Sequence, residues 1–478
     1  MGKAQCNIKV SDYYDLFKKN YLLANKFYLS MKKGIILSAL IVTIIFTGCN
    51  NNYSGELTGV PRRNKFFEPE PLEMAFVPAG SFTMGPSDQD VLFAQNSFSK
   101  TVTVDAFWMD QMEITNNKYR QFVYWVRDSI FRTKLAEAGV SNRDYYVVDR
   151  DGVPIEPYVL NWNEKIDLDD ETTLSVLEEM YYPENERFNG KKQIDVRKLN
   201  YSYYWVDYQQ AAKARYNYDY ESNTGQYEGR VISPDGTVRD VTDRSSFIIH
   251  KVINIYPDTL CWIRDFTYSF NDPMADLYFW HPSYDDYPVV GVSWVQANAF
   301  SNWRTDYMNT ALRKNGNAEV SKYRLPLETE WEYAARGGLD LSMYPWGGPY
   351  TRNYQGCFLA NFKPLRGNYI DDGSVYAAKV ASYEPNEFGL YDMAGNVSEW
   401  TSGAYHPSAY VFQHDLQPNY EYNASPNDPP VLKRKVIRGG SWKDIAYFMQ
   451  VSTRDYEYQD STKPYIGFRN VRYYIGTN

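Results

Sequence analysis

A cysteine near the amino terminus lies in a pattern that predicts covalent lipid attachment. Residues 31–33 read Met-Lys-Lys, an almost uninterrupted apolar run covers 34–46, and Thr-Gly precedes Cys49. A positive segment, an apolar run and small residues are typical of a secretory signal peptide, and the cysteine is what lipoprotein signal peptidase requires. The run is shorter than the roughly 20 apolar residues that span a bilayer. We therefore expect cleavage before Cys49, which then carries the acyl groups.

This signal divides the chain into segments. Residues 1–30 show no export pattern, and we interpret them as an upstream extension from a mis-assigned start. Residues 31–48 are the signal peptide, 49–72 a lipidated flexible tether rich in Asn and Pro, and 73–478 the body. Residues 1–48 carry seven Lys and two Asp, so their removal takes the net charge from −9 to about −14. An acidic body argues against nucleic acid as a partner.

Other reactive residues are few. The four histidines lie at 250, 281, 406 and 414 and form no His-x-x-x-His motif, and the sequence holds no Gly-x-Ser-x-Gly elbow or glycine-rich phosphate loop. With Cys49 acylated, the mature chain retains Cys261 and Cys357. These two cysteines form either one disulfide or two buried thiols, and both alternatives remain open at this point.

Several elements are predicted to position these residues. Residues 74–78 and 81–85 read as two strands of a hairpin around a glycine turn, and alternation over 102–108 predicts a further strand. Thr115 and Ser293 are expected to cap two helices. A third helix is expected from Arg324 and ends at Gly337-Gly338. The charged, tyrosine-rich stretch from about 127 to 287 reads as an insertion.

Sequence blocks across the body resemble, in order, those of the formylglycine-generating-enzyme (sulfatase-modifying factor) family. The blocks are Met74–Gly85, Val102–Val123, Pro288–Trp303, Arg324–Gly338, Tyr344–Gly347, Gly389–Trp400, Arg438–Trp442 and Gly467–Arg469. The resemblance covers roughly residues 72–474. It implies an α+β fold, related to C-type lectins, with little regular secondary structure and, here, a large insertion.

The resemblance also implies structural calcium. The residues that match the family's first site are Asn361, the backbone of Phe362, Asp372 and the backbone of Ser374. Those that match the second are Asp392, the carbonyls of Gly395 and Val397, and Glu399. Carboxylate, amide and carbonyl oxygens are the ligands that calcium prefers. The alternative is that these segments are ordinary turns.

The family's catalytic motif is altered in this chain. Members that oxidise a substrate cysteine bind copper through two cysteines that follow a Gly-Gly-Ser block. At the matching positions, three and eight residues after Ser441, this chain has Asp444 and Met449. Neither replaces a thiolate at a copper(I) site, so we expect no copper and no enzyme activity. The rival hypothesis, a divergent oxidase, predicts that activity depends on Ser441, Asp444 or Arg469.

Together these features resemble the K-subunit lipoproteins of the type IX secretion and gliding-motility machinery of Bacteroidota. That resemblance implies an outer-membrane lipoprotein facing the periplasm, which self-associates and forms a ring with an N subunit. The J lipoproteins of the same machinery are a close alternative, and a calcium-dependent, lectin-like binder of glycan or peptidoglycan is another. We expect the aromatic insertion to make the subunit contacts, so that deleting residues 195–225 abolishes the ring and leaves the body folded.

Overall fold

The computed structural model describes residues 68–476 except 87–97, 141–143, 214–217, 220–223, 226–228, 233–237, 269–270, 366–367, 369 and 372–373. All of these belong to one compact unit, residues 67–477. Cys49, the predicted signal peptide and most of the tether lie outside the described residues. No helix in the described ranges combines the length and apolarity needed to cross a membrane.

Two four-stranded sheets form the framework of the body. The first has the order β1 (Met74–Val77), β4 (Phe107–Asp110), β16 (Val471–Tyr473) and β11 (Tyr323–Arg324). The second has the order β14 (Asp455–Tyr458), β13 (Arg434–Arg438), β12 (Ser398–Ala404) and β15 (Ile466–Gly467). In both sheets strands from distant parts of the sequence are neighbours, so the carboxyl-terminal strands complete the core.

The predicted hairpin between residues 74–78 and 81–85 is wrong. The first strand pairs with β4, and the second, β2 (Gly80–Met84), pairs with β3 (Lys100–Val104). Each partner offers buried apolar side chains, Phe107 and Met109 on β4 and Val102 and Val104 on β3. Burial against these distant strands therefore decides which strands pair, and the glycine turn between residues 78 and 81 does not.

The three predicted helices are present. Helix α2 (Asn116–Glu137) follows Thr115, whose Oγ1 accepts from Lys118 N at 3.3 Å. Helix α7 (Trp294–Lys314) begins with a reciprocal capping pair between Ser293 and Gln296. Helix α8 (Glu328–Arg336) starts four residues later than Arg324, which lies in β11, and ends at Gly337, whose φ is +58°.

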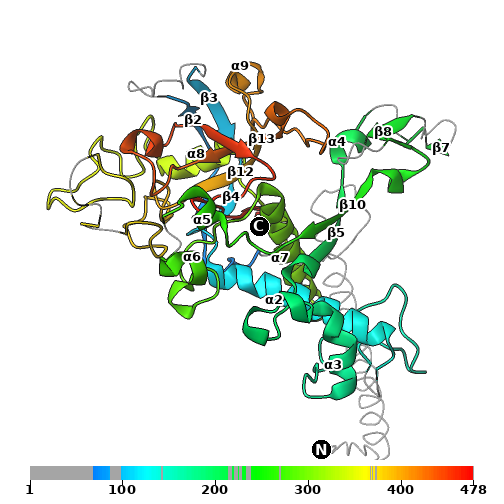
Figure 1. Ribbon diagram of the computed structural model, residues 1–478. Coiled ribbons are helices and arrows are strands. Elements are labelled where there is room, and N and C mark those ends of the chain that lie inside the picture. The colour runs from blue at the N-terminus through cyan, green and yellow to red at the C-terminus, as the bar shows by residue number, and fades with distance from the viewer. Residues whose placement is uncertain are drawn as a thin grey trace, which may run out of the picture. The chain divides into compact units, whose positions relative to one another are not determined.

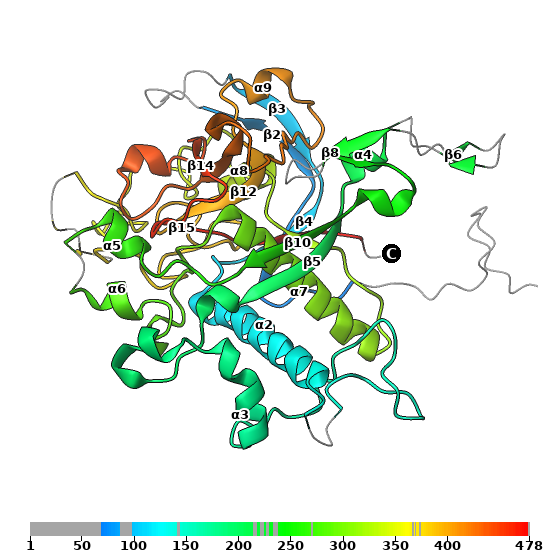
Figure 2. The ribbon, with the colours of Figure 1, turned by 45° about the vertical axis from the view of Figure 1, so that its right-hand side comes forward.

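Helix α7 packs on α2 and on the strands β5 (Asn200–Val206) and β10 (Ile248–Asn254), as Figure 2 shows. Aromatic rings dominate this part of the core: Tyr119 and Phe300 stack with centroids 5.6 Å apart, and Phe122 lies 5.1 Å from Trp303. Such rings bury large apolar areas and favour offset or edge contacts. The side of α2 that carries Tyr119, Phe122, Val123 and Val126 is therefore its core face.

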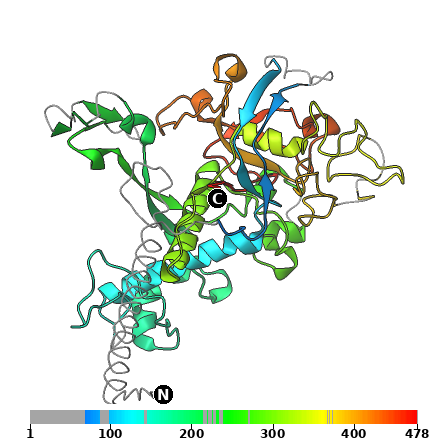
Figure 3. The ribbon, with the colours of Figure 1, turned by 180° about the vertical axis from the view of Figure 1, so that it is seen from behind.

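The tyrosine-rich segment is less separate from the body than its sequence suggests. Helix α2 continues through the predicted boundary at residue 127 to Glu137. Beyond it, β5 (Asn200–Val206) and β10 (Ile248–Asn254) form an antiparallel pair, which Figures 1 and 3 show running away from α2 and α7. Tyr201 and Tyr203 of this pair, each 6% exposed, pack in the main core.

Short elements complete the described residues. Those in the tyrosine-rich segment are α3 (Glu171–Leu177), α4 (Tyr208–Ala211), β6 (Tyr218–Asp219), β7 (Thr224–Gly225), β8 (Arg230–Ile232), β9 (Val238–Asp240), α5 (Cys261–Asp265) and α6 (Pro273–Leu277). Helix α9 (Ala409–Phe412) follows β12. Between α8 and β12 the described residues form no named helix or strand.

Candidate functional site

A buried ion pair lies where β12, α8 and the segment after β15 meet. Arg469 donates through Nε and Nη2 to both carboxylate oxygens of Glu399 at 2.6–2.9 Å, and Trp331 Nε1 donates to Oε2 at 2.8 Å. Arg469 also donates to the carbonyls of Asp110 and Tyr391. Because Arg469 and Glu399 are fully buried, this pair fixes the loops around it.

Two more buried carboxylates stand close to this pair. Asn396 Nδ2 donates to both oxygens of Glu113 at 3.1 Å, and Asp392 Oδ2 accepts from Ala381 N at 2.7 Å. Burial, and then the charge of Glu399, raises the pKa of Asp392 to about 6. Burial and the nearby Asp392 and Glu399 raise the pKa of Glu113 well above its usual value. Three carboxyl groups therefore share one guanidinium, an arrangement that favours an added cation.

The loop that carries these groups has an unusual backbone. Asp392, Gly395 and Asn396 have φ values of +54°, +79° and +58°. A Cβ on Gly395 would lie 2.4 Å from the carbonyl oxygen of Asn361, and Asn396 N donates to that same oxygen at 2.8 Å. Left-handed conformations at non-glycine residues cost free energy and collect at functional sites. Here they hold the two predicted calcium segments against each other.

The second predicted calcium site fits a cation by its charge. Asp392 and Glu399 are brought together with Gly395 and Val397, although the oxygens of Glu399 already accept from Arg469 and Trp331. Within the described ranges no cluster of three or more His, Cys, Asp or Glu side chains has the arrangement of a metal site. Calcium here would thus depend on backbone carbonyls as well as carboxylates.

The first predicted site is only partly described. Asn361 is buried, and its Nδ2 donates to the carbonyl of Tyr376 at 2.9 Å. Phe362 packs in a small apolar cluster, and Ser374 is half-buried. Asp372, the carboxylate expected at this site, lies outside the described residues.

The three degenerate active-site positions lie in one loop after β13. Ser441 Oγ donates to Asp444 Oδ2 at 2.5 Å, and Ser441 N donates to the same oxygen at 3.0 Å. Asp444 thus closes a local turn around a buried serine. Met449 is fully buried in an apolar cluster with Tyr344 and Phe362. Both positions perform structural roles in this loop.

The remaining cysteines are thiols. Cys261 is buried and Cys357 half-buried, and both are free, so the disulfide alternative does not hold. Burial raises the pKa of the Cys261 thiol, which keeps it protonated and unreactive at neutral pH.

Sequence reasoning missed Glu113 as a member of the central cluster. Glu113 lies in the block Val102–Val123, directly before Ile114 and the capping Thr115, but nothing in the sequence marks it as a neighbour of Asp392 and Glu399. A second pair that was missed joins Arg438 to Glu332, both fully buried. Their spacing in the sequence gives no hint of the contact, because β13 and α8 meet only in the fold.

Comparison with known protein families gives the family. The profile of the "Sulfatase-modifying factor enzyme 1-like domain" matches residues 61–157 and 241–474. The chain belongs to this family. Residues 158–240, which include α3 and β5, lie between the two matched ranges.

Curated relatives support this membership. The chain is 33% identical over 190 residues to "Inactive C-alpha-formylglycine-generating enzyme 2" of Bos taurus, covering 38% of this chain and 50% of the relative. It is 33% identical over 188 residues to the "Formylglycine-generating enzyme" of Streptomyces coelicolor, covering 38% and 52%. The chain thus spans about half the length of these relatives. Among solved structures, PvdO from Pseudomonas aeruginosa aligns at 18% identity over 84% of this chain and 94% of that chain, with a TM-score of 0.39.

Proposed function

We propose that this member of the sulfatase-modifying factor family is not an enzyme. The observation that carries the proposal is the loop after β13, where Asp444 closes a turn on Ser441 and Met449 fills an apolar cluster. Neither side chain supplies the thiolate that copper(I) oxidation chemistry needs. A relative named as inactive is among those that match this chain, at 33% identity over 190 residues.

Copper binding tests this proposal. The purified chain should take up no stoichiometric copper(I) and should leave a cysteine-containing peptide unchanged in an oxygen-consumption assay with mass spectrometry. The matched comparison is the Asp444→Cys/Met449→Cys double variant, which places two thiols in the same loop. Peptide oxidation by the unaltered chain at a rate that falls on Ser441→Ala would overturn the proposal.

We further propose that the protein is a lipoprotein, anchored through Cys49 to the outer membrane and facing the periplasm. There it would serve the type IX secretion and gliding-motility machinery as a structural subunit, in a ring with itself and an N-type partner. The signal-peptide pattern and the lack of an acidic residue directly after Cys49 support this location. In a ring, many modest contacts hold firmly because each raises the effective concentration of the next.

The contact surface we propose differs from the one expected from sequence. Tyr201 and Tyr203 lie in the core, so deleting residues 195–225 would damage the body itself. The opposite face of the β5/β10 pair is exposed: Tyr204, 67% exposed, stacks on His250, and Val252 is 59% exposed. Among the described residues no further strand pairs with either edge of this two-stranded sheet. Exposed apolar faces of this kind mark interaction surfaces.

Capture from solubilised envelope tests the assembly role. The tagged chain should recover a complex of many subunits with a second protein, visible as rings by electron microscopy. Tyr204→Glu/Val252→Glu should release the monomer without lowering its melting temperature. Tyr354→Glu, at a 95% exposed site outside the strand pair, is the control. A monomer from the unaltered chain would contradict the proposal.

A further inference from the structure

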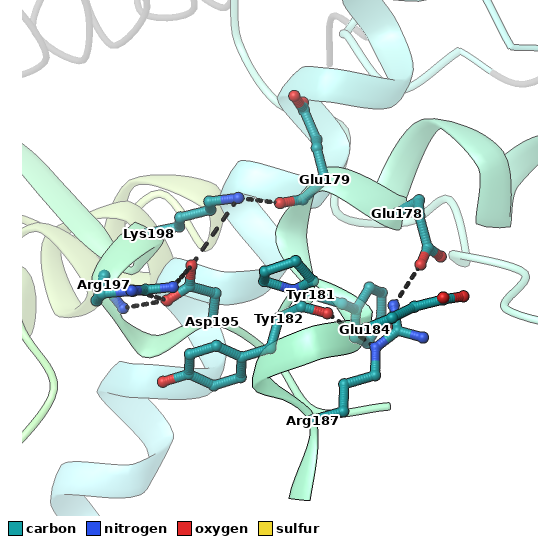
Figure 4. Close-up of a pocket in the computed structure, with 10 residues that line it drawn as sticks. Glu178, Glu179, Tyr181, Tyr182, Glu184, Arg187, Asp195, Arg197 and Lys198 are labelled. Carbon is teal, nitrogen blue, oxygen red and sulfur yellow. Dashed lines mark hydrogen bonds and ion pairs between the residues drawn. The ribbon is translucent and has the colours of Figure 1, made fainter. Parts of the chain in front are cut away.

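A pocket of about 690 Å³ lies in the part of the chain that the family profile leaves unmatched. Figure 4 shows its lining, which comes from three short helices, η1 (Glu178–Met180), η2 (Glu184–Glu186) and η4 (Val196–Lys198), and the chain between them. The lining combines the rings of Tyr181 and Tyr182 with acidic and basic side chains. A volume of several hundred Å³ is that of a small-molecule site.

The backbone around the pocket is fixed by pairing across it. Tyr182 N donates to the carbonyl of Gln193 at 2.9 Å, and Asp195 N donates to that of Met180 at 2.9 Å. Arg187 Nε donates to the carbonyl of Tyr182 at 2.8 Å. Because its walls are tied together without a ligand, the pocket is largely pre-formed, which lowers the entropic cost of binding.

Apart from Glu184, the ionised side chains that line the pocket are paired with groups of opposite charge. Arg187 Nη2 lies 2.6 Å from Glu178 Oε1. Arg197 donates through Nε and Nη2 to the two oxygens of the buried Asp195 at 2.8 and 2.9 Å. In Figure 4 Lys198 also reaches Asp195. A charged ligand would therefore meet a nearly neutral surface and gain little from Coulomb attraction.

Several hydrogen-bonding groups in the pocket are unused. Among the described residues no side chain or backbone group bonds to the carboxylate of Glu184, to Nη1 of Arg187 or to the hydroxyls of Tyr181 and Tyr182. These groups include donors and acceptors, and they border the apolar ring surfaces. A complementary ligand must both donate and accept while presenting C–H groups to the rings.

We propose that this pocket binds a saccharide. Sugar hydroxyls donate and accept at once, so they match the carboxylate of Glu184, Nη1 of Arg187 and the phenol groups of the two tyrosines. The C–H face of a pyranose ring matches the tyrosine surfaces. A zwitterionic peptide end is less well matched, because Arg187 and Arg197 are already paired with carboxylates. None of the predicted calcium ligands lines this pocket, so we expect binding without calcium.

Isothermal titration on the full chain tests this site. The probes are N,N′,N″-triacetylchitotriose, maltotriose and, for the charged alternative, the dipeptide Ala-Ala. We expect saturable binding of at least one trisaccharide, unchanged by EDTA. The Glu184→Gln/Arg187→Lys variant should weaken it at least tenfold. Glu171→Gln, at an exposed glutamate that starts α3 and does not line the pocket, should bind normally.

Three results would overturn the proposal. They are no binding of either trisaccharide by the unaltered chain, binding of Ala-Ala alone, and equal saccharide binding by the Glu184→Gln/Arg187→Lys variant. Loss of fold could imitate a loss of binding, so the melting temperature of each variant is measured in parallel. Tyr182→Phe removes one hydroxyl and keeps the ring, and it should weaken binding less than the double variant.

Discussion

Gly440, between β13 and Ser441, has a conformation and surroundings that exclude any side chain. Its φ is +66°, and a Cβ there would lie 2.7 Å from the carbonyl oxygen of Phe448. Gly440→Ala should lower the free energy of unfolding by roughly 2–4 kcal/mol, because it adds backbone strain and a clash with main chain. Urea unfolding measures this loss. Gly356 has a φ of +90° and open space around it, so Gly356→Ala adds backbone strain without a clash and should lower the free energy of unfolding by about 1 kcal/mol. Equal losses in the two variants would show that the predicted clash at Gly440 contributes nothing.

Asp392 links protonation to the calcium site that the family resemblance implies. Its pKa, raised to about 6 by burial and then by Glu399, lies above that of the unfolded chain. The folded state therefore binds the extra proton between about pH 4 and 6, and without metal its stability falls as the pH rises through that window. Added calcium should raise the melting temperature at pH 7.5 and much less at pH 5.

A variant separates this effect from general salt effects. Asp392→Asn should lose most of the calcium-dependent rise at pH 7.5 and flatten the metal-free pH profile between 4 and 6. Asp276→Asn, at an exposed aspartate on α6, is the control. An equal calcium response in both variants would exclude Asp392 as a ligand.

At the scale of elements, β13 and β10 place two lysines near each other. Lys435 is 1% exposed, donates to the carbonyl of Tyr422 at 2.8 Å and lies over the ring of Trp294. Burial, and the nearby Lys251, lower the pKa of Lys435 to about 7. The unfolded chain holds this proton up to about pH 10, so stability should increase as the pH rises from about 7 to 10.

Urea unfolding at pH 7 and pH 9.5 measures this effect. In the unaltered chain, the free energy of unfolding should rise between these pH values by on the order of 3 kcal/mol, which corresponds to about two pKa units. The Lys435→Met variant should lack this rise. Lys314→Met, at the exposed end of α7, should leave the rise in place and controls for the titration of other groups. A rise that persists in Lys435→Met would show that Lys435 is not its source.

The same scale shows which elements sequence can predict. Thr115, Ser293 and Gly337 each act within a few residues of themselves, so the ends of α2, α7 and α8 follow from local hydrogen bonds. Strand partners depend on distant burial instead, which is why the hairpin expected around Gly80 is wrong. Glu399, Arg469 and Glu113 all lie within blocks that carry the family resemblance, but only the folded chain shows that Glu113 lies beside the other two.

At the scale of the whole molecule, the family domain and the tyrosine-rich segment share one core. The β5/β10 pair packs against α7 through its inner face and exposes its outer face. Composition predicted an aromatic insertion, but it could not show which of the aromatic side chains are buried. Alternate residues on a strand point to opposite faces of the sheet, so neighbouring tyrosines can differ in exposure. The number of tyrosines in the segment therefore overestimates the aromatic surface available for subunit contacts, because Tyr201 and Tyr203 are buried.

The position of β16 also has a consequence for biosynthesis. This strand lies between β4 and β11, and Arg472 within it pairs with the buried Glu68 at the other end of the described chain. A nascent chain that has reached only residue 465 lacks β15, Arg469 and β16, so Glu399 is left buried without its counter-ion. Native packing of the first sheet and of the surroundings of Glu399 must then wait until the last segment has been synthesised.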